Sequence, residues 1–530
     1  MHKSIHSIQE HLTNAPGSYL SRLRTKFTKK SGLVQNSKIL GEICAEILNE
    51  ERLQKWMQKR KEWEILALGL IYASGSRGLH FKELERSLDT DQKSLIAFLN
   101  ETANELFIWH VKCQGACIYY GFSDFEDYFL NFSFKNEEAI ESVAWISNEK
   151  KAELHLLFVL SKIQLGKVSV KKNDSLSHIA KKHIANFFSN NKNIDNAITE
   201  DEIRLLFSFL IFEKWISKNA ESGELKLLPT AYDFLRNNGF RLFSEFIFWW
   251  ERERFKNKGE LLKLLKFFEK PLDALNATRL FWPRDTSSRL FKKNSINWFQ
   301  LPLPLKELWI LGILKMQIRK KHILTFSLSE FGESVFFAKQ PKENLSEPII
   351  ANSSNFEWFL SQSNGAFRIF QMSCLAQVKN DEDPLRFVFS KESFLNGLRS
   401  GFPSDYVQDF FSWNRAVPNV AAALDEWLHI YSDSSINTMH ILRIRNLDKF
   451  AELSAYKPFL ACVEEVIPNW GFVIKAENEK KIRGMLTHFS LVPHSFTPSP
   501  NREEPLKKLA ETENFKLARP IPEGEDAMFG

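Results

Sequence analysis

Three stretches of this chain share one local pattern, and that pattern limits the folds available to it. Each has alternating apolar residues, then a small hydroxyl residue, then a run with helical spacing; they read CIYYGFSDFEDYFLN, LKLLPTAYDFLRN and KHILTFSLSEFGESVF. Alternation is typical of a half-buried strand, and Ser and Thr are favoured at helix N-caps. We therefore expect a strand and then a capped helix at each place, with Ser123, Thr230 and Ser329 as the caps.

The segments before these stretches predict helices and a hairpin. Three helical runs precede the first stretch and lead into HVKCQGACIYYGF, where Gly115 separates two alternating segments as in a tight hairpin. Three helices followed by a hairpin are the elements of a winged helix, a variant of the helix-turn-helix. The same order precedes the second stretch, with a turn near Gly223, and the third, whose first two helices we place within residues 259–297.

The length of 530 residues is too great for a single core. We predict a multidomain chain, mainly α with α+β, in which tandem winged-helix-like units precede an α+β domain. The predicted segments are a basic N-terminal arm with helices (1–61), a first unit (62–135), a second unit (150–240), a third unit with inserted helices (241–340), the α+β domain (347–493) and a disordered tail (494–530).

Positive charge is clustered although the formal net charge of +6 is small for this length. Between Tyr19 and Ile39 there are six lysines and arginines and no acidic residue; three of the six, Arg22, Arg24 and Lys26, are candidate nucleic-acid contacts. A run of this kind is either a solvated arm or a contact for a polyanion, and the sequence leaves both open.

Further candidate contacts occur in each winged-helix-like unit. They are Gln92 and Lys93 at the start of the third helix and Lys112 on the wing of the first unit, Lys171, Lys172, Lys181 and Lys182 in the second unit, and Arg319, Lys320 and Lys321 at the wing tip of the third. Flexible cations suit phosphate contacts, which give affinity without sequence choice. Each cluster alone is equally typical of solvated surface, and winged helices also dock proteins.

The segment 347–493 alternates runs typical of strands and helices, including PLRFVFS and a helix that begins at Ser390. Its central run, LRFVFSKESFLNGLRSGFPSDYVQDFFSWNRAVPNVAAALDEWLHIY, is followed by a strand, a helix, a strand and a last helix ending in LTHFSLVP. This pattern resembles the N-terminal DNA-binding domain of XPB-type DNA repair helicases, which also occurs in helicase-associated proteins. The chain departs from the family after Tyr431, where SDSSIN stands in place of a glycine.

The resemblance implies DNA association and work beside a helicase, but no motor. The glycine-rich phosphate loop GxxxxGK[ST] that a motor needs does not occur in the sequence. Arg443 and Arg445 alternate on one expected strand, where they would hold phosphates through charge-assisted hydrogen bonds, and Lys481 lies on the last helix. The alternative is a sheet edge protected by charge.

The sequence predicts no catalytic residue, metal site or cofactor. Cys113 and Cys117 are four residues apart, and no second Cys or His pair follows at zinc spacing. No nucleophile elbow or catalytic carboxylate pair is present. Five scattered cysteines, apolar runs shorter than a membrane span and the lack of an opening signal sequence lead us to expect a cytoplasmic protein.

These observations together predict a non-catalytic DNA-binding accessory protein that acts with a helicase in DNA repair or transcription. Its expected partners are double-stranded or forked DNA, bound with low sequence specificity, and a separate helicase motor protein; no membrane is involved. The alternative is a protein-interaction scaffold that docks a helicase or polymerase subunit without touching nucleic acid.

Overall fold

The structure is a computed structural model of the chain. It describes residues 7–134 apart from 14, 33, 89 and 114, then 143–171, 175–188, 196–219, 222–255, 258–285, 296–319, 322–337, 350–402, 417–432, 440–474, 476–491 and 503–505. The described part is mainly helical with five small antiparallel sheets, which confirms the prediction of a chain that is mainly α with α+β parts.

The first unit has the order helix, strand, helix, helix, strand, strand. Its elements are α5 (Glu62–Ala73), β1 (Leu79–His80), α6 (Phe81–Ser87), α7 (Gln92–Asn104), β2 (Ile108–Cys113) and β3 (Ala116–Gly121). The strand order is β1-β3-β2, so the short first strand pairs with the second strand of the hairpin, which is central in the sheet. Gly115 occupies the hairpin turn with a φ of +80°, as the sequence predicts.

The second unit has three helices and a hairpin, with an isolated bridge in place of the first strand. Its elements are α9 (Lys151–Gln164), α10 (His178–Phe188), α11 (Asn196–Phe212), β5 (Ile216–Asn219) and β6 (Leu225–Leu227). An antiparallel bridge between Ser169 and Glu224 places the segment before α10 against the end of the hairpin. Gly223 has a φ of +69°, and a Cβ there would lie 2.3 Å from the carbonyl oxygen of Val170, so this close approach requires glycine.

The third unit has the order of the first unit, with one strand added. Its elements are α14 (Lys258–Leu265), β7 (Leu272–Asp273), α15 (Ala274–Phe281), α16 (Leu303–Ile310), β8 (Leu314–Arg319) and β9 (His322–Leu328). The strand order is β4-β8-β9-β7, and β4 (Trp145–Ser147) comes from the chain between the first and second units. Helices α14 and α15 are the two that we expected near residues 259–297.

A helix follows each wing, but only one of the three predicted caps is correct. These helices are α8 (Glu126–Ser133), α12 (Pro229–Asn238) and α17 (Glu330–Phe337). The Ser329 hydroxyl oxygen accepts a hydrogen bond from the Gly332 amide at 2.8 Å, as a cap does. Thr230 instead lies inside α12, because Pro229 already has the φ that a first helical residue needs, and Ser123 opens a short 3-10 turn before α8.

The remaining elements surround these units. The N-terminal segment forms α1 (Ile8–Thr13), α2 (Gly17–Thr28), α3 (Asn36–Ile47) and α4 (Glu50–Met57). Helix α13 (Leu242–Arg254) precedes the third unit. The elements after the third unit are β10 (Ile350–Asn352), β11 (Glu357–Leu360), α18 (Ala366–Leu375), β12 (Gln377–Val378), β13 (Leu385–Val388), α19 (Lys391–Arg399) and α21 (Pro418–Ser432). Ser390 caps α19, with its hydroxyl oxygen 3.1 Å from the Ser393 amide nitrogen.

The segment 347–493, which we predicted as one domain, contains two separate cores. Helices α18, α19 and α21 pack into the large core that runs through the preceding units. A second core is formed by β14 (His440–Arg443), α22 (Leu447–Ala455), α23 (Lys457–Leu460), β15 (Val463–Ile467), β16 (Gly471–Ile474) and α24 (Glu479–His488). The family resemblance rests on a linear pattern of apolar positions, and such a pattern does not tell which core each position joins.

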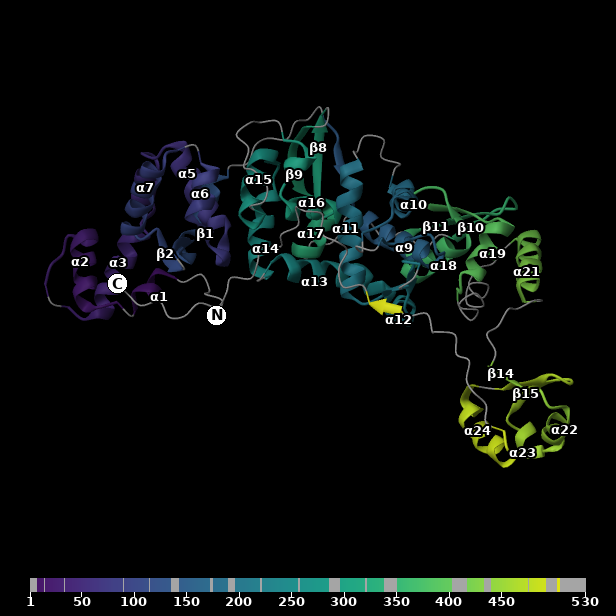
Figure 1. Ribbon diagram of the computed structural model, residues 1–530. Helices are drawn as coiled ribbons and strands as arrows, with labels where there is room; N and C mark the ends of the chain where they lie inside the picture. The colour runs from purple at the N-terminus through teal and green to yellow at the C-terminus, as the bar shows by residue number, and fades with distance from the viewer. Residues whose placement is uncertain are drawn as a thin grey trace.

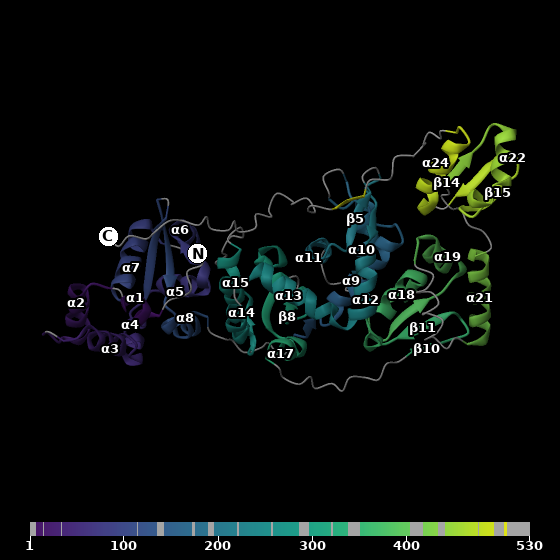
Figure 2. The same cartoon turned by 90° about the horizontal axis from the view of Figure 1, so that it is seen from below.

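The units do not follow one another in space as they do in sequence. The third unit lies between the first and the second, and the second lies next to β10–β13 (Figures 1 and 2). The strand β4 explains this order, because the chain crosses the third unit's sheet before it builds the second unit. In the predicted disordered tail, Glu503–Pro505 forms a strand, β17, which pairs with β5.

A buried histidine joins the second unit to the sheet that follows the third. His155 of α9 lies with its Nδ1 atom 2.6 Å from Glu202 of α11 and its Nε2 atom 3.7 Å from Asp381, which also pairs with Lys151 at 3.1 Å. Burial alone lowers the pKa of His155, but the two carboxylates outweigh it and raise that pKa above its usual value. Burial raises the pKa of Asp381, but the neighbouring His155 and the charge of Lys151 hold it well below its usual range.

These shifts predict how stability depends on pH. The contribution of His155 to the free energy of unfolding is fully present below its unfolded-state pKa of about 6.5. It is lost as the pH rises through the higher folded-state pKa. The contribution of Asp381 is lost in the opposite direction, as the pH falls through its lowered folded value. Calorimetry at about pH 6 and about pH 9 should therefore show a larger drop in unfolding midpoint for the wild type than for His155→Gln. Equal drops would contradict this account.

The control for this prediction is Lys55→Gln. Lys55 and Glu51 form an exposed ion pair at 3.9 Å, and exposed pairs add little stability. We expect this variant to unfold as the wild type does at both pH values.

Candidate nucleic-acid interface

The first two turns of α7 present an exposed face in the first unit. The Asp91 carboxylate accepts a hydrogen bond from the Ser94 amide at 2.9 Å and so fixes the start of the helix. Gln92 and Lys93 are exposed in the first turn, as predicted, and Ile96 is 43% exposed. Gln92, Ile96 and Asn100 are spaced by four residues and therefore share one face of the helix.

The far end of the same helix is covered by the N-terminal segment. The Arg60 guanidinium bonds both carboxylate oxygens of Glu101, at 2.7 and 3.0 Å, and Arg52 bonds Glu105 at 2.5 Å. Lys26 of α2 also pairs with Glu105, at 3.0 Å. The N-terminal segment thus supports α7 from its C-terminal end and leaves its N-terminal face open to solvent.

The corresponding helix of the second unit is buried. In α11 the long apolar run from Leu205 to Leu210 lies in the core, interrupted only by the half-buried Ser208. Asp201 is also buried, and its carboxylate lies 2.9 Å from the indole nitrogen of Trp298 and 3.2 Å from the ammonium of Lys306. Both partners belong to the third unit, so this face of α11 is an internal contact.

The corresponding helix of the third unit is buried as well. Glu307 of α16 is inaccessible and accepts hydrogen bonds from the Trp250 indole at 2.8 Å and from the Arg254 guanidinium at 2.6 and 2.7 Å. Leu305, Leu308, Trp309 and Ile310 are all buried. The described exposed positions of α11 are the acidic Glu200 and the apolar Phe212, whereas α7 exposes Gln92 and Lys93 in its first turn.

The predicted contacts fall into three groups. The first is exposed, with no ion pair to another described residue: Arg22, Gln92, Lys93, Lys112, Lys171, Lys182, Arg319, Arg443, Arg445 and Lys481. The second pairs with a carboxylate: Arg24, Lys26 and Lys181. The third lies outside the described residues: Lys172, Lys320 and Lys321. The described members lie on several separate elements and do not make one continuous site.

Arg24 is a correction to the sequence analysis. Its side chain is buried, with Nε 2.7 Å from the Glu42 carboxylate and a hydrogen bond of 3.2 Å to the Gly32 carbonyl. The hydrogen bond from Arg24 also holds the pKa of Glu42 below its usual value. The residue joins α2 to α3, and the run of cations gave no sign that one member faces inward.

The candidate contacts Arg443, Arg445 and Lys481 lie on different sides of the sheet formed by β14, β15 and β16. Leu442 faces the core with Ile482 of α24, and Arg443 alternates with Leu442 on β14 and so faces the other way. Arg445 continues this alternation beyond the end of β14. Lys481 therefore lies on the helix-covered side, away from the two arginines.

The sequence analysis missed part of the α7 face. Ile96 and Asn100 were not candidates, although their spacing of four residues from Gln92 predicts a common face once the helix start is known. Amide side chains such as Gln92 and Asn100 are suited to reading adenine edges in a major groove.

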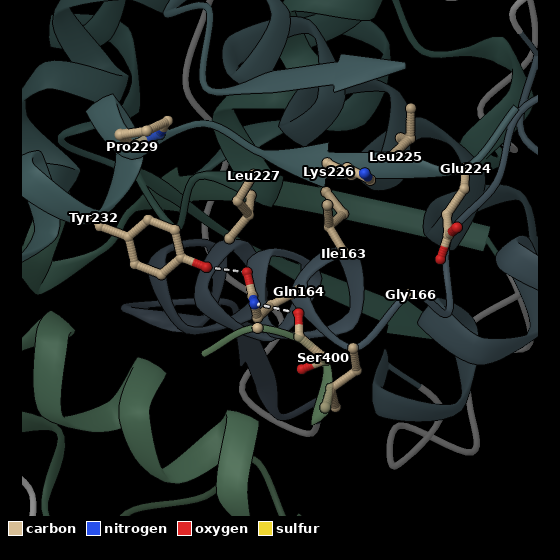
Figure 3. Close-up of a pocket in the computed structure, with 12 residues that line it drawn as sticks. Ile163, Gln164, Gly166, Glu224, Leu225, Lys226, Leu227, Pro229, Tyr232 and Ser400 are labelled. Carbon is tan, nitrogen blue, oxygen red and sulfur yellow. Dashed lines mark hydrogen bonds between the residues drawn. The ribbon is translucent and has the colours of Figure 1, made fainter. Parts of the chain in front are cut away.

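A pocket of about 400 Å³ lies between the second unit and the end of α19, but it holds no reactive constellation (Figure 3). The Tyr232 hydroxyl donates to the side-chain oxygen of Gln164, whose amide nitrogen donates to the Ser400 carbonyl at 2.9 Å. These polar groups bond to one another, which is typical of a junction between packed units.

Two searches of the described residues bear on other classes of site. Within those residues, no group of three or more histidine, cysteine, aspartate and glutamate side chains is placed to hold a metal ion. No helix that the structure describes is long and apolar enough to cross a bilayer.

Comparison with known proteins adds no family assignment. No protein-family model matches the chain, and no curated protein is similar to it.

We predict that the neighbouring residues Arg22 and Arg24 differ in their effect on stability. Arg24→Gln removes a buried guanidinium and leaves Glu42 without it, so the unfolding midpoint should fall by several degrees. Arg22→Gln changes an exposed side chain that contacts only the Tyr19 ring, 5.8 Å away, and should leave the midpoint unchanged. A thermal melt of each variant tests this, and equal midpoints would show that the inward position of Arg24 is wrong.

Proposed function

We propose that this chain is a non-catalytic DNA-binding accessory protein built from tandem winged-helix units. The support for the winged-helix assignment is the topology itself. The first and third units have the order helix, strand, helix, helix, hairpin, and in the second an isolated bridge between Ser169 and Glu224 takes the place of the first strand. That order is typical of winged helices.

The observation that carries the DNA assignment is the accessible face of α7. Its first turn exposes Gln92 and Lys93, and Lys112 is exposed on the hairpin of the same unit. In helix-turn-helix proteins the N-terminal residues of the third helix meet base edges, while the wing contacts the backbone. In the first unit, both the first turn of α7 and Lys112 on the hairpin are exposed to solvent.

The second and third units have a different role in this proposal. Much of α11 and most of α16 is buried, α16 in part against α13, so we assign the DNA contacts of these units to surface cations such as Lys171, Lys182 and Arg319. Weak contacts on linked units add through effective concentration. The expected ligand is duplex or forked DNA, bound with low sequence specificity.

The helicase connection rests on the resemblance of residues 347–493 to the XPB-type domain. A separate helicase motor is the protein partner that this resemblance favours, in repair or transcription and in the cytoplasm.

The second candidate function is a scaffold that docks a helicase or polymerase subunit without nucleic acid. The burial of α11 and α16 favours it, since two of the three units use their third helix for protein packing.

The test uses the purified full-length protein and a labelled DNA duplex. Lys93→Glu combined with Lys112→Glu places two negative charges on the proposed interface, so duplex affinity should fall and the slope of log K against log salt should decrease by about 2. Fluorescence anisotropy over a salt series measures both quantities.

The matched control is Lys55→Glu combined with Lys391→Glu, which makes the same change in net charge at exposed positions elsewhere. We expect a much smaller loss of affinity from the control. Equal losses from both double variants would contradict an interface at α7, and a lack of duplex binding by the wild type would favour the scaffold.

A further inference from the structure

The sheet at the C-terminal end of the described chain has its helices on one side. Helices α22, α23 and α24 pack with Leu442 and Phe472 on that side of the sheet (Figure 1). On β14 the alternate residues Ile441 and Arg443 point to the other side, and Ile441 is 46% exposed. The side opposite the helices is therefore accessible along the β14 edge.

An exposed tryptophan stands at one end of this edge. Trp470 lies in the turn between β15 and β16, its carbonyl accepts a hydrogen bond from the Ile444 amide at 3.2 Å, and its side chain is 38% exposed. The Arg443 guanidinium lies over its ring, 5.2 Å from the centroid. Trp470 does not belong to the core of this sheet, so burial does not explain its position.

The charges beside this ring favour an anionic ligand. Neither Arg443 nor Arg445 forms an ion pair with any residue that the structure describes, and both are exposed. On the far edge of the sheet, Glu465 of β15 is paired with Val473, which is itself paired with Ile441 of β14. A negatively charged strand would therefore follow the β14 edge and avoid the β15 edge.

We propose that Trp470, Arg443, Arg445 and Ile441 form a binding site for single-stranded nucleic acid. A base stacks on the exposed surface of the Trp470 ring, and the two guanidinium groups hold the adjacent phosphates. The proposal rests on the proposed function in assuming a nucleic-acid ligand. It adds a single-stranded segment to the duplex that the first unit contacts, as at a fork or an opened duplex.

A purely structural role for the same residues predicts a different outcome. If the Arg443–Trp470 contact only closes the end of the sheet, its loss lowers stability and leaves ligand affinity unchanged. Stacking, in contrast, depends on an aromatic ring and tolerates a change of ring type.

The experiment uses the full-length protein and a labelled oligodeoxythymidine of about 12 nucleotides, within the range that a single binding fold spans. Trp470→Ala should weaken binding by about tenfold, the typical effect of losing one stacked base, whereas Trp470→Phe should retain most of the affinity. An oligouridine of the same length identifies the source, because a tighter complex with one sugar assigns the site to DNA or to RNA.

Tyr456→Ala is the matched control. Tyr456 is 39% exposed in the same domain but lies on the helix side, with its ring 5.4 Å from that of Phe489. Its removal should leave oligonucleotide affinity unchanged. If Trp470→Ala unfolds the domain, Trp470→Phe still gives an answer, since the quenching of tryptophan fluorescence by the bound oligonucleotide should be smaller in that variant.

Two results would overturn the site. One is an unchanged affinity for the oligonucleotide in a folded Trp470→Ala variant, and the other is equal quenching in the wild type and Trp470→Phe. Neither result bears on duplex binding by Lys93 and Lys112, so failure of this site is distinguishable from failure of the proposed function.

Discussion

The contact between helix α11 of the second unit and helix α16 of the third unit determines which helix surfaces of the molecule remain accessible to a ligand. A carboxylate in an apolar interface is costly unless it is hydrogen-bonded, and Asp201 of α11 meets this condition with the Trp298 indole and the Lys306 ammonium. Asp201 also pairs with Arg204 of its own helix, while Trp298 and Lys306 come from the third unit, so the same carboxylate joins the two units.

This contact assigns different roles to units of the same topology. Helices α11 and α16 hold the second and third units together. Helix α7 remains accessible in the first unit, which lies on the other side of the third unit from the second (Figure 2). The N-terminal helices support that helix through Arg52 and Arg60 without covering its first turn. The molecule thus combines a rigid middle with candidate ligand surfaces on the first unit and on the final sheet.

Local features of the fold were predictable from the sequence, and the arrangement of the units was not. The turn at Gly115, the cap at Ser329 and the start of α19 at Ser390 follow from residues that act on their immediate neighbours. The position of β4 in the third unit's sheet and the burial of α11 depend on contacts between distant segments. The apolar run from Leu205 to Leu210 of α11 is in retrospect the signal that much of this helix is buried. The inward position of Arg24 depends on Glu42, eighteen residues away, and a count of charges does not detect it.

The most direct measurement of the central claim is amide hydrogen exchange of the full-length protein with and without a DNA duplex. Helices α11 and α16 should be strongly protected in both samples, because their faces are already buried, and added protection should appear in the first turns of α7 and in the hairpin of β2 and β3. Added protection in α11 or α16 with none in α7 would contradict the account, because it would place the ligand on the helices that hold the units together.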